Sequence, residues 1–297
     1  MHESLLPVAV IFLLLISGYY SGKIMRASLK LFLISKISNI VLLLLVCMGV
    51  DFGNVFTDKD IGYSVIQNSM AFSAILALIT FFFLYRKQEK TVEKNKGTSF
   101  LNSFKGCLKA LLAFLVGVGI FRFTGFKLES IHFSSSFILY ILIYMVGMDL
   151  VGFRVKKLTL DLVIVPVLTV MATLTAVFIF SAFSHLSWRE LLVISSGFGW
   201  FSLSGPMVNK LVSTEMGAMA FMTDFFREMF SIIFLYFLGQ TQPRSAIGIS
   251  GAAALDSALP FIKENCEDSF ISYAIVSGFV LTVLAPFLIS FSVTLLQ

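Results

Sequence analysis

Long hydrophobic runs, separated by short polar segments, form the dominant pattern along the chain. The first six runs cover residues 5–21, 37–50, 62–85, 106–124, 134–150 and 160–184. Several of them reach the roughly 20 apolar residues with which a helix crosses a bilayer. Their apolar residues are continuous and do not alternate with polar ones, which favours helices over the strands of a membrane barrel. The pattern predicts an all-α polytopic membrane protein.

The last third of the chain combines continuous runs with interrupted ones. Residues 216–238 and 270–295 predict two further full spans. The segments 191–206 and 246–262 are apolar but rich in small residues, and each reaches a proline that precedes a short polar loop. We expect eight transmembrane helices if these broken segments are re-entrant, and ten if they cross the membrane. Both numbers are even, so the two termini are expected on the same side.

Composition agrees with a membrane location. Of the 297 residues, 58% are hydrophobic and only 13% are charged, whereas a soluble domain has roughly 25% charged residues. The net charge of +5 does not indicate a nucleic-acid partner, because the basic residues lie in short loops between the runs. Cys47, Cys107 and Cys266 have no CxxC spacing, so we expect neither a disulfide framework nor a metal site. No cofactor is expected.

The loop charges predict the orientation. Most of the loop Lys and Arg residues follow the first, third and fifth runs, and few lie in the loops of the opposite side. By the positive-inside rule the richer side is cytoplasmic, so the N-terminus and the C-terminus are both expected outside. We therefore expect a multi-pass protein of the bacterial cytoplasmic (inner) membrane.

A short internal echo suggests duplication. The sequence VCMGVDFG closes the second run and YMVGMDLVG closes the fifth, so that Gly49 and Asp51 correspond to Gly147 and Asp149. Both pairs are separated by the same offset of 98 residues. For Asp51 and Asp149, which lie where a run meets a loop, we favour an ordinary interfacial position.

The echo also predicts the domain organisation. Each copy contains three spans, an odd number, so the two copies must have opposite orientations, as in many secondary transporters. We expect residues 1–184 to form two inverted three-helix repeats. Residues 185–297 are then expected to form a transport core of two broken segments and two full spans, within a single membrane domain.

Ionisable residues interrupt the apolar span 216–238. The sequence FMTDFFREMF contains Asp224, Arg227 and Glu228, whose spacing places them along one side of a helix. An ionisable side chain at the centre of a span costs ~3 kcal/mol or more, so such residues are functional candidates. Arg227 can neutralise only one of the two acids, and a net negative charge remains. The alternative is an interhelical ion pair that only stabilises the bundle.

The second broken segment contains one isolated acid. In ISGAAALDSALP, Asp256 is the only charged residue between Arg244 and Lys263. One interpretation is a loop aspartate that caps a helix beginning near Ser257. The other is a carboxylate beside an open helix end in a solvated cavity.

The first broken segment, SSGFGWFSLSGP, is the expected companion of this acid. Its glycines allow the backbone to approach a ligand closely. The candidate binding residues of this segment are Ser196, Gly197, Gly199, Trp200, Ser202 and Ser204.

Three stretches resemble the bacterial lysine exporter (LysO) family in order and spacing: SGFGWFSLSG, FMTDFFRE and GAAALDSALP. The similarity extends over nearly the whole chain. It implies export of L-lysine and its toxic analogue thialysine from the cytoplasm, with a functional pair of intramembrane acids at Glu228 and Asp256. The chain departs from the family pattern at Thr223, where the pattern has Asn. Asp51 and Asp149 are not part of the pattern.

The residues suit such a substrate. Glu228 and Asp256 suit the ammonium groups of lysine, and the first broken segment suits its carboxylate, because a half-helix N-terminus favours anions. Moving a cation outward costs ~2.3 kcal/mol per 100 mV, and exchange for one proton cancels that charge movement. With Asp224 and Arg227 as further coupling residues, we expect a lysine/proton antiporter with alternating access. The expected partners are L-lysine, protons and the lipid bilayer, and an oligomer is compatible with the sequence.

Other functions stay open. A transporter or channel for inorganic cations is the principal alternative, because an acid-lined pore also suits Na⁺ or K⁺. An intramembrane protease fits less well: Asp256 follows AAL and not GxG, and SLSG lacks the first glycine of GxSG. A purely structural protein has no need of two intramembrane acids and two broken segments, and no enzyme activity is expected.

Overall fold

The computed structural model describes residues 2–86, 100–131, 133–152 and 159–296. Within these ranges the regular secondary structure is entirely helical, which confirms the all-α fold class. Six helical stretches of the described residues are long and apolar enough to cross a membrane. Many of the basic loop residues on which the orientation was argued, at 87–99 and 153–158, lie outside the described residues.

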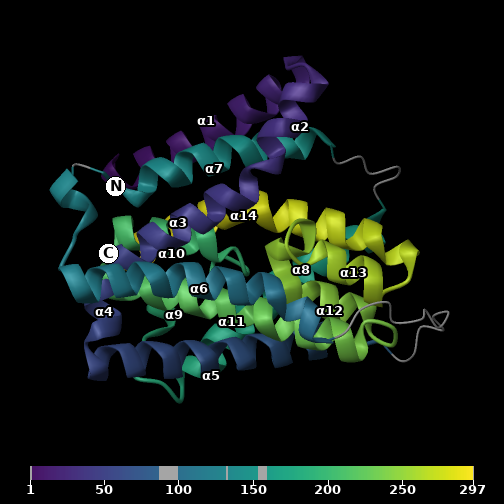
Figure 1. The fold of residues 1–297 in the computed structure, drawn as a ribbon. Helices are drawn as coiled ribbons and strands as arrows, with labels where there is room; N and C mark the ends of the chain where they lie inside the picture. The colour runs from purple at the N-terminus through teal and green to yellow at the C-terminus, as the bar shows by residue number, and fades with distance from the viewer. Residues whose placement is uncertain (1, 87–99, 132, 153–158, 297) are drawn as a thin grey trace.

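Among the described residues, eight long helices correspond to the eight continuous runs (Figure 1). They are α1 (His2–Ile24), α3 (Ile37–Asp51), α5 (Lys59–Leu84), α6 (Phe100–Thr124), α7 (Ser135–Asp149), α8 (Leu160–Ser181), α11 (Thr214–Leu238) and α14 (Ile271–Leu296). Short helices α4 (Gly53–Thr57), η1 (Leu128–Ile131), η2 (Leu150–Gly152) and η4 (Asp268–Phe270) connect them. The two chain ends lie at the same end of the molecule in Figure 1.

The segment between the first two runs differs from the prediction. It was expected to be a basic loop, but α1 continues to Ile24 and a further helix, α2 (Ala27–Ser35), leads almost directly into α3. The apolar residues Leu29, Leu31 and Phe32 of α2 are exposed on the described surface, as expected for a helix that meets lipid. The apolar sequence LKLFLI therefore forms a helix although it contains a lysine.

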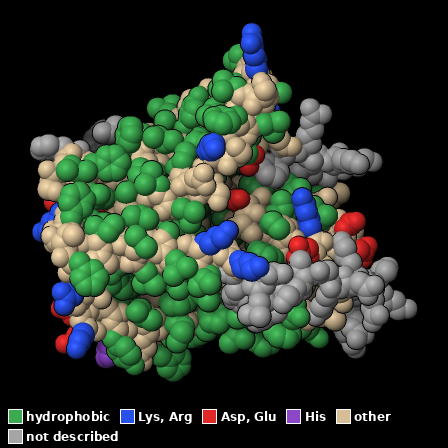
Figure 2. All heavy atoms as spheres, viewed as in Figure 1, with side chains coloured by type: hydrophobic (Ala, Val, Ile, Leu, Met, Phe, Trp, Pro, Cys, Tyr) green, Lys and Arg blue, Asp and Glu red, His purple; other side chains and the backbone are tan. Residues whose placement is uncertain are grey.

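The surface is apolar around the long helices. Large side chains such as Phe82, Phe123 and Phe183 project outward and are largely exposed. Figure 2 shows hydrophobic side chains across most of the described part of this face, with Lys and Arg at its edges and in a few places near its centre. Exposed apolar patches of this extent indicate contact with a membrane.

The first two groups of helices are interlocked. α1 packs along α7, and α3 packs along α6 (Figure 1). Gly18 of α1 meets Gly147 of α7, and Gly49 of α3 meets Gly117 of α6, so closely that a Cβ on any of the four would overlap with a backbone oxygen of the facing helix. In both crossings, the first long helix of one three-helix group packs against the second long helix of the other.

Each broken segment is a helical hairpin. The first consists of α9 (Trp188–Ser195) and α10 (Phe201–Leu211), and the second of α12 (Pro243–Ser250), the 3₁₀ turn η3 (Gly251–Leu255) and α13 (Leu259–Asn265). The sequence placed the end of the first segment at Pro206, but Pro206 lies inside α10, which continues to Leu211 and includes Lys210 of the expected polar loop.

The two hairpins approach the middle of α11 from opposite ends. The first hairpin ends beside the start of α11, where the Cβ of Asn209 lies 2.7 Å from the position a Cβ on Gly217 would take. Leu186, which precedes α9, lines a small cavity with Met219 near the same end. The second hairpin ends beside the last turn of α11, where Asn265 contacts Gly239. Each hairpin therefore begins and finishes near the same end of α11.

The hairpin tips touch at the centre. The backbone oxygen of Phe198 accepts a hydrogen bond of 2.9 Å from the amide of Ala252. Gly199 and Gly251 have φ angles of 89° and 61°, the left-handed region that glycine adopts without strain. A Cβ on Gly251 would overlap with the oxygen of Phe198. The contact between the tips thus requires glycine at position 251.

Candidate functional site

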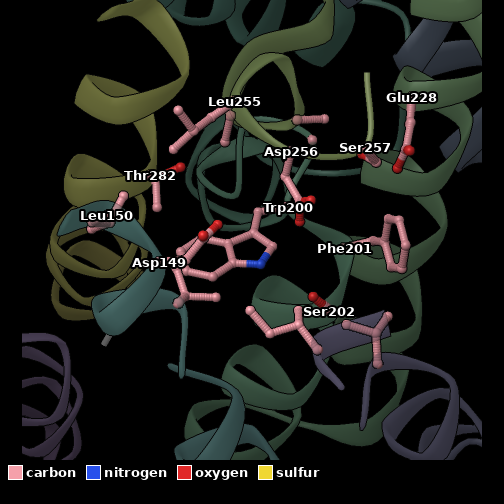
Figure 3. A pocket seen from close by; sticks show the side chains of 16 residues that line it. Asp149, Leu150, Trp200, Phe201, Ser202, Glu228, Leu255, Asp256, Ser257 and Thr282 are labelled. Carbon is pink, nitrogen blue, oxygen red and sulfur yellow. The ribbon is translucent and has the colours of Figure 1, made fainter. Parts of the chain in front are cut away.

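Two adjoining cavities lie beside the hairpin tips, with volumes of about 120 Å³ and about 470 Å³. We call the two together the acidic cavity, because Asp149, Glu228 and Asp256 line both of them. Figure 3 shows these three side chains around the smaller cavity, together with Trp200 and Ser257. The larger volume falls in the range of roughly 300–1,000 Å³ that is typical of small-molecule sites.

The larger cavity extends toward one end of the molecule. It continues past Ser35 and Ser38, at the junction of α2 and α3, to Gly106 and Lys109 near the start of α6. This is the end at which α6 begins, and in the sequence the basic residues of 87–99 come directly before that helix. Figure 2 shows acidic side chains in the middle of the viewed face, with Lys and Arg side chains nearby.

Glu228 is the most deeply buried of the three acids. It lies near the middle of α11, is only 5% exposed, and its Oε2 atom has no hydrogen-bond partner among the described residues. Burying a carboxylate oxygen without a partner is costly, so this oxygen is expected to meet a cation or to carry a proton. The free oxygen belongs to a residue that lines the cavity.

Asp256 follows the η3 turn of the second hairpin. Its side chain is accessible, and it lines both parts of the acidic cavity. The alternative in which Asp256 caps a helix is wrong, because α13 has Ala258 at its N-cap position and no side-chain cap. Asp256 is therefore a cavity carboxylate.

The first hairpin contributes a helix end to the cavity. Gly199, Trp200, Phe201 and Ser202 line the smaller cavity, and α10 begins at Phe201. The N-cap residue, Trp200, makes no side-chain hydrogen bond to the helix. The amides of a first helical turn have no partner within the helix, and together with the helix dipole they attract anions.

The other residues predicted in this hairpin do not line the cavity. The Ser196 hydroxyl donates to the oxygen of Leu192 and lies 3.0 Å from the hydroxyl of Ser292. Gly197 packs against Asp224 and Ser204 on the far side of the turn. Ser196, Gly197 and Ser204 thus support the hairpin, and only Gly199, Trp200 and Ser202 of the six predicted residues line the cavity.

Asp224 and Arg227 lie behind the hairpin tips and line neither part of the cavity. Both are fully buried. An Oδ1 atom of Asp224 accepts a 2.7 Å hydrogen bond from the amide of Gly199. The Nε of Arg227 donates 3.1 Å to the oxygen of Ile249, at the C-terminal end of α12. Each charge therefore stabilises the backbone of one hairpin, which favours a structural role for these two residues.

Asp149 is the acid that the sequence interpretation undervalued. It is the last residue of α7, which was expected to place it at the membrane interface, but it lines both parts of the acidic cavity. Ser257 and Thr282, which the sequence did not single out, also line the smaller cavity. The internal echo gives Asp149 the same sequence context as Asp51, so the sequence contains no signal that distinguishes the two acids.

Asp51, the counterpart of Asp149, lies elsewhere. It accepts a 2.6 Å hydrogen bond from Ser135 and lines a separate cavity of about 370 Å³, together with Glu129 and Lys210. We call this the opposite cavity. It is bordered by the start of α11, at Thr214, and thus lies toward the other end of that helix from the second hairpin.

Packed aromatic rings extend from the acidic cavity to the residue that follows Asp51. Phe201 and Phe225 line the acidic cavity, and their ring centroids are 5.9 Å apart. Phe221 stacks on Phe225 at 6.0 Å and on Phe114 at 4.6 Å. Phe52, which follows Asp51 in the chain, lies 6.2 Å from Phe221. These five residues form an aromatic layer.

Comparison with known proteins identifies relatives. The family described as "Lysine exporter LysO" matches residues 111–293, a range that contains all three cavity acids. The lysine exporter LysO of Escherichia coli K12 is 31% identical over 195 residues, which cover 64% of this chain and 64% of that protein. A candidate lysine exporter of Haemophilus influenzae Rd is 32% identical over 169 residues, 54% of this chain and 86% of that protein.

No solved structure matches the chain significantly. The match covers less than two thirds of the length of the Escherichia coli relative. The family match nevertheless spans more than half of this chain, and the family is one of transporters and not of enzymes. The chain therefore belongs to the lysine exporter LysO family.

Proposed function

We propose that this protein exports L-lysine from the bacterial cytoplasm across the inner membrane, by alternating access and in exchange for protons. The observation that carries the proposal is the pairing of Glu228 and Asp256 in one cavity among apolar helices. Membership of the lysine exporter family and the names of the relatives supply the substrate.

The cavity offers complementary groups to both ends of an amino acid. Glu228 and Asp256 bind ammonium groups by charge-assisted hydrogen bonds. The amides of Phe201 and Ser202, in the first turn of α10, bind the carboxylate. The indole ring of Trp200 adds a cation–π surface for an ammonium group.

Proton exchange follows from the environment of Glu228. A buried carboxylate oxygen without a partner is stabilised either by a bound ammonium group or by a proton. The two are therefore mutually exclusive on the same oxygen. Arrival of a proton from outside releases the substrate, and arrival of lysine from inside releases the proton.

The topology supports alternating access. The acidic cavity extends toward the end at which α6 begins, directly after the basic residues of 87–99 in the sequence, and the aromatic layer extends from it to the residue that follows Asp51. By the positive-inside rule this is an inward-facing state, with both termini outside. In this topology the eight long helices cross the membrane, and the two hairpins are re-entrant.

The helix crossings support the proposed repeat. A two-fold axis that relates two inverted copies within residues 1–184 would produce two such interlocked glycine pairs. Residues 185–297 then form the core, with one hairpin entering from each side.

Flux measurements test the function. Purified protein is reconstituted in liposomes, the membrane potential is clamped, and the flux of labelled L-lysine is measured with and without a pH gradient. We expect lysine flux well above that of empty liposomes, and a several-fold increase under the gradient that drives exchange. Flux that ignores the pH gradient would exclude the coupling, and absent lysine flux with measurable Na⁺ flux would favour the inorganic-cation alternative.

A further inference from the structure

A third carboxylate faces the acidic cavity. Asp149 comes from α7, whereas Glu228 comes from α11 and Asp256 from the second hairpin, so three separate elements each bring one acid to the same space. In the view of Figure 3 the indole ring of Trp200 lies between Asp149 and Asp256. No basic side chain lines the smaller cavity among the described residues.

The cluster has a second feature that indicates a ligand. Glu228 is 5% exposed, lines the cavity, and keeps one carboxylate oxygen without a partner among the described residues. Lys30 of α2 is a basic neighbour of Asp149 but forms no salt bridge with it within 4.0 Å, although both side chains are described. The acids thus have fewer positive partners than negative charges.

Lysine offers the cavity more than one positive group. It carries two ammonium groups, whose nitrogen atoms are separated by five carbon atoms, and one carboxylate. If Glu228 and Asp256 together meet one ammonium group, the second needs a further carboxylate, and Asp149 is the other acid that lines both parts of the cavity.

We propose that Asp149 binds the second ammonium group of the substrate, so that the cavity selects amino acids with two ammonium groups. This proposal rests on the proposed function. One ammonium group lies at Glu228 and Asp256, and the other reaches Asp149 along the indole ring of Trp200. The apolar residues Val146 and Leu150, on either side of Asp149, line the smaller cavity and pack against the methylene groups.

The chain contains its own reporter for this test. Trp188 and Trp200 are the two tryptophans of the chain, and Trp200 lines the cavity. In a Trp188→Phe background, the fluorescence of Trp200 reports binding of L-lysine and of norleucine, which has the same carbon chain but lacks the second ammonium group. We expect lysine to bind at least about tenfold more tightly than norleucine.

The variants then separate recognition from folding. We expect Asp149→Asn and Asp149→Ser to weaken lysine binding by about tenfold or more and to leave norleucine binding unchanged. Asp149→Glu keeps the charge and should retain most of the affinity for lysine. The matched control is Asp51→Asn, which changes the equivalent acid in the opposite cavity and should alter neither ligand.

The outcomes distinguish the two proposals. Unchanged lysine binding in Asp149→Asn, or an equal loss for lysine and norleucine, would overturn the role of Asp149 alone. If the Trp188→Phe protein itself bound no lysine and transported none, the proposed function would be wrong instead.

Discussion

The carboxylate of Asp224 accepts a 2.7 Å hydrogen bond from the amide of Gly199, in the turn of the first hairpin. One turn further along α11, Arg227 donates to the oxygen of Ile249 in the second hairpin. A single helix thus contacts both hairpin tips through two opposite charges, and the next residue, Glu228, lines the cavity beside the tips. The position of the cavity acid depends on the two buried charges beside it.

Removing the cavity acids is expected to abolish export. Glu228→Gln and Asp256→Asn keep the shape of the side chains but remove the charge that binds ammonium, and an interaction of this kind is worth roughly 1.5–3 kcal/mol. We expect at least tenfold lower lysine flux in both. Growth in the presence of lysine or thialysine, in cells without their own lysine exporter, provides a second measurement.

The control for these two variants lies on the same helix. Glu215, in the first turn of α11, is exposed, and Glu215→Gln should leave the flux unchanged. Full protection of cells by Glu228→Gln and Asp256→Asn at equal expression would remove both acids from the mechanism.

The buried charges behind the tips should affect stability. In Arg227→Gln the oxygen of Ile249 loses its charged donor and Asp224 stays buried without its neighbour, and such a change costs about 3–5 kcal/mol. We expect a much lower thermal unfolding temperature in detergent for Arg227→Gln than for Glu228→Gln. Equal unfolding temperatures in the two variants would contradict the structural role of Arg227.

The crossing of the hairpin tips should tolerate no side chain at position 251. Gly251→Ala combines a φ of 61° with an overlap on the oxygen of Phe198, so we expect a loss of about 1–3 kcal/mol or more. Gly119, in α6, has open space around a Cβ, and Gly119→Ala should be neutral or slightly stabilising. Thermal unfolding of the two variants compares them directly, and similar values would mean that the tips adjust freely.

Cysteine accessibility tests the proposed orientation. In a background with Cys47, Cys107 and Cys266 replaced by Ala, Ser38→Cys at the mouth of the acidic cavity should react with a membrane-impermeant thiol reagent from the cytoplasmic side only. Lysine should slow this reaction. Ser134→Cys, in the opposite cavity, should react from outside. The reverse pattern would invert the proposed topology.

The sequence predicted the positions of the long helices more accurately than the contacts between them. The eight continuous runs became the eight long helices, because continuous apolar residues of this length determine a helix without reference to neighbours. The helix α2 was missed, because its lysine and its flanking basic residues outweighed its apolar run in the interpretation.

Site residues were predicted where their chemistry alone was unusual. Glu228 and Asp256 line the cavity as expected, because an acid among apolar residues needs a special environment. Asp224 was expected in the site but lies behind the hairpin tips, whereas Asp149 was expected at the membrane interface but lines the cavity. The face of a helix that meets the cavity is determined by packing between distant segments. The spacing of charges within one segment therefore does not predict it.

The two glycine crossings described above have a consequence for biogenesis. Gly18 meets its partner only when α7 is present, and Gly49 only when α6 is present. As the chain emerges from the ribosome, α1, α3 and α5 therefore enter the membrane first. The helices against which α1 and α3 pack, α7 and α6, are then not yet present. We expect these first helices to remain protease-accessible or chaperone-bound in a chain that stops before α6, and to become resistant together once α7 has been inserted.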